Sequence, residues 1–209
     1  MARANVYVDG FNLYYGCLRD TPYKWLDPAR LALLLLPRSC HVHRIRYYTA
    51  RVSGRPTDPN APRRQEIYLR ALRTIPSLTI TFGHFLTSEV TMPLARPQRG
   101  GPMTARVIKT EEKGSDVNLA SHLLLDAFRG DCEVAFVISN DSDLLEPVRI
   151  ARREFGVQVG LGCPHERPSQ VLLRYADFIR PIRVGVLRVS QLPKTLSDDH
   201  GTFTKPSSW

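Results

Sequence analysis

A single stretch near residue 140 constrains the fold of this chain most strongly. The apolar run Val134–Ile138 breaks into Ser-Asn-Asp-Ser-Asp and resumes with Leu144 and Leu145. A short apolar run bounded by polar residues is typical of a strand that is buried on both faces. Such a strand would deliver Asp141 and Asp143 to its carboxyl end, where ligands bind in open parallel α/β sheets. Because Asp and Asn are also frequent helix N-caps, either acid could serve only as a cap.

The rest of the chain alternates between strand-like and helix-like segments. Period-two or continuous apolar patterns predict strands at Asn5–Asp9, Val42–Val52, Leu78–Phe85, Glu133–Ile138, Val157–Leu161 and Phe178–Ile182. Helical periodicity with Pro and Gly at the ends predicts helices at Leu26–Leu36, Ala61–Ile75, Val117–Phe128, Leu144–Phe155 and Ser169–Ala176. This alternation predicts an α/β fold with a mainly parallel sheet and helices on both of its faces.

Two regions do not fit this alternation. Leu86–Lys109 is extended and interrupted by prolines and a Gly-Gly-Pro turn, which predicts an excursion or hairpin that could form a substrate-facing flap. The end of the chain is polar, as in disordered tails, although Phe203 and Trp209 indicate docking on the body or on a neighbour. We therefore expect a domain over residues 1–189 and a polar tail over residues 190–209.

The charge of the chain is unevenly distributed. The net charge is +9, and the segment from Arg38 to Arg73 holds nine arginines and only two acids. This excess of arginine favours binding to a polyanion such as RNA, although a solvated surface without a partner remains the alternative. The interleaved Tyr47, Tyr48 and Tyr68 could stack on bases, but tyrosines in such positions more often belong to a half-buried core.

Membrane and disulfide classes receive no support from the sequence. The four cysteines are scattered and show no metal-ligand spacing, which is typical of reduced, buried thiols. No apolar run is long enough to cross a bilayer, and the first residues contain no signal-peptide core. We therefore expect a cytoplasmic protein that does not bind membranes.

Four carboxylates are predicted at corresponding ends of secondary-structure elements. Asp9 follows the first strand, Asp116 opens a helix, and Asp141 and Asp143 follow the central strand. Each acid alone could be a helix cap, but four converging carboxylates repel one another unless a cation neutralises them. Ligation by oxygen alone points to Mg²⁺ or Mn²⁺. Asn12, one helical turn after Asp9, could hydrogen-bond this carboxylate or a ligand.

A divalent ion held in this way is suited to phosphodiester hydrolysis. A metal-bound water becomes acidic enough to attack phosphorus in line, while nearby cations hold the phosphate backbone. The basic candidates for substrate binding lie beside the acids or within the arginine-rich segment: Arg63, Arg64, Lys109, Lys113 and Arg149. For any one of them, solvation at the surface is the alternative.

Three sequence blocks resemble a known family. Val8–Asn12, Lys113–Val117 and Ser139–Asp143 are similar, in order and spacing, to the signature blocks of the NYN domain. The similarity is to the LabA-like (DUF88) branch of the PIN-like nuclease superfamily and extends over roughly Ala4–Ile182. The resemblance implies a Rossmann-like, three-layer α/β/α sandwich of PIN-like type. It also implies a divalent-metal site that cleaves RNA.

The resemblance also assigns roles to individual residues. The catalytic and metal-binding acids would be Asp9, Asp116, Asp141 and Asp143. The supporting polar residues of the same blocks would be Asn12, Ser139, Asn140 and Ser142, of which Asn12 and Ser139 would orient the ligand or a metal-bound water. The chain departs from its relatives in two places, with Asn140 in place of a common glycine and His122 in place of an acid.

Two other functions remain open at this level. The chain could be a non-catalytic RNA- or nucleotide-binding module that keeps the fold and the basic surface. One branch of similar proteins is labelled as an NADH-dependent hydroxylase of a 6-hydroxy-3-succinoylpyridine-type compound. The segment Val159–Cys163 does not match the GxGxxG pattern of dinucleotide-binding folds, so no residue pattern supports that chemistry. Proteins of this class often pair, so a homodimer is a further expectation.

Overall fold

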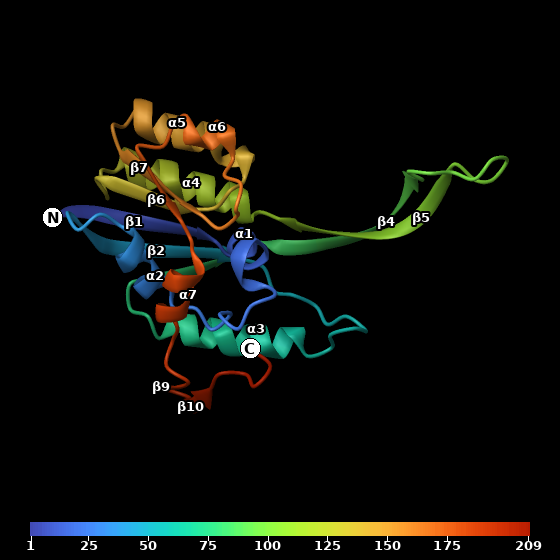
Figure 1. Cartoon of the computed structure of the whole chain (residues 1–209), viewed down its shortest axis with the longest axis horizontal. Helices are drawn as coiled ribbons and strands as arrows, with labels where there is room; N and C mark the ends of the chain where they lie inside the picture. Colours follow the sequence, from blue (N-terminus) through green and yellow to red (C-terminus); the bar gives the residue numbers. More distant parts are fainter.

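The computed structural model describes residues 1–209, and its centre is a six-stranded parallel sheet with helices on both faces (Figure 1). The strand order is β3-β2-β1-β6-β7-β8. The strands of this sheet are β1 (Ala2–Asp9), β2 (Cys40–Thr49), β3 (Leu78–Phe82), β6 (Val134–Ile138), β7 (Gln158–Cys163) and β8 (Phe178–Pro181). The predicted α/β fold with a parallel central sheet is confirmed.

The helices form the two outer layers of the sandwich. One face is covered by α2 (Pro28–Leu35), α3 (Ala61–Arg73) and α7 (Val184–Val189). The opposite face is covered by α4 (Ser115–Phe128), α5 (Leu145–Arg153) and α6 (Gln170–Leu173). Three short segments complete the helical part, namely α1 (Gly10–Leu13), the π-helical η1 (Tyr14–Leu18) and the 3₁₀ turn η2 (Ser142–Leu144). None of the helices is both long and apolar enough to cross a membrane.

Successive residues of the central strands enter different cores. Val6 and Ile138 pack with the α2–α3–α7 layer, whereas Tyr7 and Val137 pack with the α4–α5–α6 layer. This division follows from the alternation of side chains along a strand. All five residues of β6 are buried, because a central parallel strand is covered on both faces. The two cores therefore fix the strand ends from both sides.

The order of the strands places a crevice between β1 and β6. From β1 the chain builds β2 and β3 on one side, and it later returns to build β6, β7 and β8 on the other side. The two strands are neighbours in register, from Ala4 opposite Val134 to Val8 opposite Ile138. A reversal of strand order of this kind opens a ligand-binding crevice at the carboxyl ends. Consequently, the next residues along each strand, Asp9 and Ser139, meet at this crevice.

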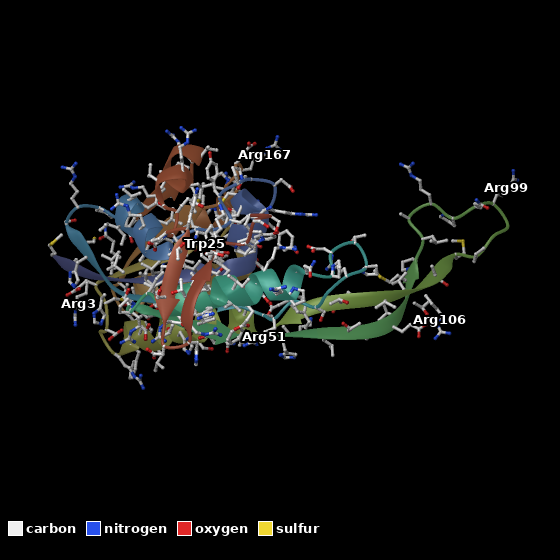
Figure 2. The ribbon with its side chains drawn as sticks, turned by 90° about the horizontal axis from the view of Figure 1, so that it is seen from below. Arg3, Trp25, Arg51, Arg99, Arg106 and Arg167 are labelled. Carbon is white, nitrogen blue, oxygen red and sulfur yellow. The ribbon has the colours of Figure 1, made fainter.

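A long antiparallel hairpin projects from the body. It consists of β4 (His84–Pro93) and β5 (Thr104–Lys113), which pair only with each other. Figure 1 shows this arm extending far beyond the helical layers, and Figure 2 places Arg99 near its tip and Arg106 along a strand. The predicted hairpin is confirmed.

The arm begins earlier than predicted. β3 ends at Phe82, and Phe85, which was predicted to lie in the same strand, belongs to β4. Gly83 separates the two strands at a crowded point, where an added Cβ would lie 2.1 Å from Oε1 of Glu112 and 2.5 Å from the carbonyl oxygen of Lys113. A glycine is therefore needed where the arm leaves the sheet.

The end of the chain is ordered against the body. β9 (Thr195–Asp198) and β10 (Gly201–Thr204) form a small hairpin beside α3. The guanidinium of Arg70 donates two hydrogen bonds to Asp198, at 2.7 and 2.6 Å, and lies 4.2 Å from the ring centre of Phe203. A bidentate pair and a cation–π contact at one arginine thus hold the hairpin in place.

Trp209 extends this contact into the core. Its ring lies 6.4 Å from that of Trp25 and 5.4 Å from that of Tyr68 in edge-to-face arrangements. The indole of Trp25 also donates a hydrogen bond to the carbonyl of Pro193 at 2.8 Å. The polar composition of this segment favours disorder, but its few aromatic residues bury enough surface to order it.

Candidate active site

The two strands at the crevice are joined by a shared carboxylate. Asp9, which is buried, accepts a hydrogen bond from the backbone nitrogen of Asn12 and another from Oγ of Ser139, each at 2.9 Å. The same Ser139 oxygen accepts a bond from the backbone nitrogen of Asp141 at 3.1 Å. Asp9 therefore caps α1 and also links the first and third sequence blocks. Asp9 is thus both a helix cap and a member of the acidic cluster.

Asn12 and Asn140 organise the loops around the crevice. The amide oxygen of Asn12 accepts a hydrogen bond from the backbone nitrogen of Asn140 at 2.9 Å. The side chain of Asn140 in turn accepts from the backbone nitrogen of Ser169 at 2.6 Å and donates to the carbonyl of Arg167 at 3.1 Å. The asparagine that replaces a common glycine thus ties the loop after β7 to the end of β6.

The third block separates its two acids. Asp141 caps the 3₁₀ turn η2 by accepting a bond from the backbone nitrogen of Asp143 at 3.0 Å, and it also lines the cavity described below. Ser142 and Asp143 are exposed and do not line that cavity. In a 3₁₀ helix with three residues per turn, side chains two residues apart point in different directions. Asp143 therefore lies at the margin of the site.

Asp116 does not act as a helix cap. Gly114 is the N-cap of α4 and has a φ of 98°, a left-handed conformation that glycine adopts without strain. This tight junction leads from β5 directly into α4 and places Asp116 in the first turn. The Asp116 carboxylate makes no capping hydrogen bond and lines the same cavity as Asp9 and Asp141.

Burial and nearby like charge raise the pKa of two of these acids. Burial, followed by the nearby charges of Asp9 and Asp141, raises the pKa of Asp116 to about 6. Burial also raises the pKa of Asp9, against the opposing effect of its hydrogen bonds from Asn12 and Ser139. Glu112 contributes like charge to both groups. Carboxylates in this state favour either a proton or a bound cation.

Glu112 also belongs to the acidic cluster, although it was not among the site residues predicted from the sequence. Its Oε1 accepts hydrogen bonds from the backbone nitrogen and Oγ of Ser115, at 3.2 and 2.8 Å. It lines the cavity beside Phe85, its cross-strand partner at the base of the arm. The only signal in the sequence was its position just before the second block. An isolated charged pair, Glu111–Glu112, is more often a solvated strand face.

We expect the Asp116→Asn variant to be more stable than the wild type by about 1 kcal/mol at pH 8 in EDTA. The folded state binds the Asp116 proton more tightly than the unfolded chain, so wild-type stability falls as the pH rises from about 4 through about 6. The expected stability difference allows for solvent screening, because the Asp116 side chain is only half-buried. Urea denaturation at pH 8 and pH 4 should show the difference at pH 8 only.

An exposed aspartate, Asp199, provides the matched control, because Asp199→Asn removes the same charge away from the cluster. The control should have nearly the same stability as the wild type at both pH values. A loss of stability in Asp116→Asn at pH 8 would contradict mutual repulsion among the acids.

Asp9, Glu112, Asp116 and Asp141 all line one cavity of about 880 Å³. Its basic lining comes from Arg19, Lys24, Arg55 and Arg64. Of the predicted substrate-binding residues, only Arg64 lines this cavity, where it also pairs with Asp58. The cavity therefore joins an acidic edge to a basic wall.

The other predicted basic residues lie outside the cavity. Lys109 and Lys113 pair with Glu111 on the arm, at 2.8 and 3.6 Å. Arg149 pairs with Glu146 along α5, with one nitrogen–oxygen distance of 2.8 Å. Arg63 lies in the first turn of α3 but does not line the cavity. The structure thus brings together the acids and Arg64, and it leaves these four basic residues apart.

His122 occupies a separate place on α4. Its Nδ1 lies 3.0 Å from the hydroxyl of Tyr48, and the two rings are 5.8 Å apart. Burial and the neighbouring Arg46 lower the pKa of His122, which favours the neutral imidazole. His122 does not line the cavity. The departure from an acid at this position therefore leaves Asp9, Asp116 and Asp141 together.

The donor set suits a hard divalent cation. No three acidic, histidine or cysteine side chains are spaced as a ready-made ligand cage. Mg²⁺ needs only one or two carboxylates, since it retains several waters. Asp9, Asp116 and Asp141 offer oxygen ligands alone. The pKa values of Asp9 and Asp116 are raised by burial and by like charge, which a cation would offset. The chemistry of the residues therefore fits such an ion.

Comparisons with known proteins agree with this architecture. A curated relative, the 6-hydroxy-3-succinoylpyridine 3-monooxygenase HspA of Pseudomonas putida (strain DSM 28022 / S16), is 30% identical, with 99% of this chain and 75% of that protein covered. A crystal structure of a protein of unknown function from Vibrio parahaemolyticus RIMD 2210633 matches with a TM-score of 0.57 and 19% identity. This match covers 88% of this chain and 94% of that one, and it shows the fold alone.

The family profile described as the NYN domain matches residues 3–183. This range contains all three signature blocks and every strand of the central sheet. It also contains each acid that lines the cavity. The chain therefore belongs to the NYN domain family.

Proposed function

We propose that this protein is a divalent-metal-dependent ribonuclease that hydrolyses RNA phosphodiester bonds at the acidic edge of the cavity. The NYN family is generally one of nucleases, which supports a hydrolytic enzyme. The observation that carries the proposal is the meeting of Asp9, Asp116 and Asp141, from three separate segments, at the switch point of a parallel sheet. Their position matches the site at which such sheets bind ligands.

Asp9, Asp116 and Asp141 would hold the ion, Mg²⁺ or Mn²⁺, with Asp143 at the outer margin. When bound, the ion supplies an acidified water and neutralises charge on the phosphate. Ser139 and the backbone nitrogen of Asn12 keep the Asp9 carboxylate in a fixed orientation through two hydrogen bonds. Fixing the ligands before substrate arrives reduces the reorganisation needed during the reaction.

The basic wall would hold the RNA backbone. Arg19, Lys24 and Arg55 line the same cavity as the acids and, unlike Arg64, form no ion pair with a protein carboxylate. Arginine and lysine in such a position contact phosphate oxygens independently of base sequence. Lys109 lies farther along the arm and Lys113 lies at its base, where both would meet a longer RNA. Binding should therefore weaken as salt rises.

The test is cleavage of a labelled single-stranded RNA with Mg²⁺, with Mn²⁺ and with EDTA, by wild-type protein and by Asp141→Asn. Asparagine preserves the cap on η2, since its amide oxygen also accepts a hydrogen bond. We expect product only with metal and little with the variant. Cleavage that persists both in EDTA and in Asp141→Asn would refute the mechanism. Salt-sensitive binding without any product would identify a binding module.

A second candidate function comes from the name of the Pseudomonas putida relative, a monooxygenase of a pyridine derivative. The cavity contains aromatic side chains suited to a small ring. However, Gly160 and Gly162 lie within β7, and an added Cβ at either would press on Phe136, so they form no phosphate-binding loop. An NADH-oxidation assay with 6-hydroxy-3-succinoylpyridine separates the two functions, because oxidation dependent on this substrate would favour the monooxygenase.

A further inference from the structure

The cavity lining includes a group of neighbouring aromatic side chains, here called the aromatic end, that has no role in the proposed hydrolysis. Tyr47 from β2, Tyr68 from α3 and Trp209 line this part of the cavity. The rings of Tyr47 and Tyr68 are 6.4 Å apart, and those of Tyr68 and Trp209 are 5.4 Å apart, both edge to face. Three elements distant in sequence thus build one aromatic wall.

The Tyr47 hydroxyl has no partner within the protein. The residue is only 6% exposed, yet its oxygen makes no hydrogen bond and is not sealed from solvent. By contrast, the hydroxyl of Tyr68 donates to the carbonyl of Leu26 at 2.9 Å. Buried hydroxyls are normally paired, so one that is unpaired and faces a cavity is available to a ligand.

The turn that carries Asp9 is shaped around the Tyr47 ring. A Cβ added to Gly10 would lie 2.8 Å from Cε1 and Cζ of Tyr47 and 2.7 Å from the carbonyl oxygen of Tyr48. Only a glycine lets this turn approach so closely. Tyr47 and Asp9 both line the cavity beside this turn. The hydroxyl and the acidic edge therefore face the same space.

We propose that the aromatic end of the cavity is a pocket for one planar nitrogen heterocycle, a single unstacked base of bound RNA, with the Tyr47 hydroxyl as its polar contact and Trp209 as part of its wall. The assignment rests on the proposed ribonuclease function. Aromatic side chains take up bases by contact with the π-face, and a single donor hydroxyl fixes orientation. Lys24 and Arg64 line the same cavity and would hold the attached phosphates.

A base is favoured over a wholly apolar ligand by the surroundings of the wall. Charged and polar side chains line the cavity together with the aromatic ones. At about 880 Å³ it also exceeds the space that one ring needs. The remaining space leads to Asp9, which would leave the sugar and phosphate of the same nucleotide beside the acids. A free heterocycle, such as a pyridine derivative, has the same kind of ring but lacks the attached sugar and phosphate.

The test measures binding of a short single-stranded RNA to the Asp141→Asn protein in Mg²⁺, so that its result does not depend on turnover. An abasic nucleotide is placed at each position in turn. A base pocket predicts that one position weakens binding by roughly 10- to 100-fold, the scale of base–aromatic stacking, while the others have little effect. Trp209→Phe should remove the quenching of protein fluorescence that accompanies binding of the intact RNA.

Tyr47→Phe removes the hydroxyl alone and should weaken binding of the intact RNA by roughly 3- to 10-fold, the scale of one neutral hydrogen bond. The matched control is Tyr175→Phe, because Tyr175 packs under Arg153 outside the cavity. Equal effects of all abasic positions, or wild-type binding by Tyr47→Phe, would overturn the pocket. A free pyridine carboxylate that binds in a Tyr47-dependent manner, while no abasic position matters, would overturn the RNA source. Cleavage assays remain a separate measurement, so failure of either proposal is visible without the other.

Discussion

The Asp9→Asn variant is expected to cleave RNA roughly 1,000-fold more slowly than the wild type, the size of effect produced by several kcal/mol at the transition state. Asp9 is the most buried of the acids in the cavity, so its charge is the least screened by solvent. Asparagine keeps the cap on α1, since its amide oxygen can accept the bond from the backbone nitrogen of Asn12. The substitution thus removes charge without removing the turn.

Single-turnover rates on a labelled RNA in saturating Mg²⁺ measure this effect. The control is Asp27→Asn, because Asp27 caps α2 through the backbone nitrogens of Ala29 and Arg30 and lies outside the cavity. This variant should cleave at the wild-type rate. If Asp9→Asn retains a rate within tenfold of the wild type, its carboxylate takes no part in the reaction.

The position of the site was predictable because it follows from chain topology. The apolar run Val134–Ile138 could only be a buried strand, and acids after such strands meet at one edge of a parallel sheet. Asp9, Asp116 and Asp141 were found from this rule and from the three sequence blocks. Hydrophobic periodicity therefore predicted most of the central sheet and, together with the three sequence blocks, most of the acidic cluster.

Residues whose role depends on turn geometry were not predictable in the same way. Asp143 was grouped with Asp141 because both follow the buried strand and belong to the third sequence block. The strand ends before them, and the 3₁₀ turn η2 directs Asp143 outward instead. Glu112 joins the acids only because Gly114 folds β5 back into α4. Neither turn leaves a pattern in hydrophobicity.

The orientation of two neighbouring tyrosines was also not predictable from the sequence. Tyr47 and Tyr48 are neighbours on β2 and look alike in the sequence. In the structure, Tyr48 enters the α4 layer and contacts His122, whereas Tyr47 faces the cavity. Strand alternation predicts that they diverge, but not which of the two meets the crevice. That choice depends on how the sheet is layered, which sequence alone does not specify.

A buried ion pair holds α4, the helix that carries Asp116, against the sheet. Asp126 is 1% exposed, and its oxygens accept bonds from Nε and Nη2 of Arg46, both at 2.8 Å. The same carboxylate accepts a bond from the Tyr7 hydroxyl at 2.9 Å and another from the Asn5 amide at 3.3 Å. One side chain thus satisfies donors from both β1 and β2. Its removal would leave the Arg46 guanidinium and the Tyr7 hydroxyl without this partner, whereas the Asn5 amide also donates to Asp131 at 2.8 Å.

We expect Asp126→Ala to lower the free energy of unfolding by about 3–5 kcal/mol, because it leaves the charge of Arg46 without a partner in a largely buried position. Urea denaturation followed by circular dichroism measures the change. Glu146→Ala, which breaks an exposed pair with Arg149 on α5, should lower the free energy of unfolding far less. The double variant Arg46→Met/Asp126→Leu removes both charges and should recover much of the loss. A cost for Asp126→Ala no larger than that of Glu146→Ala would mean that the pair does not anchor α4, and that Asp116 is positioned by packing alone.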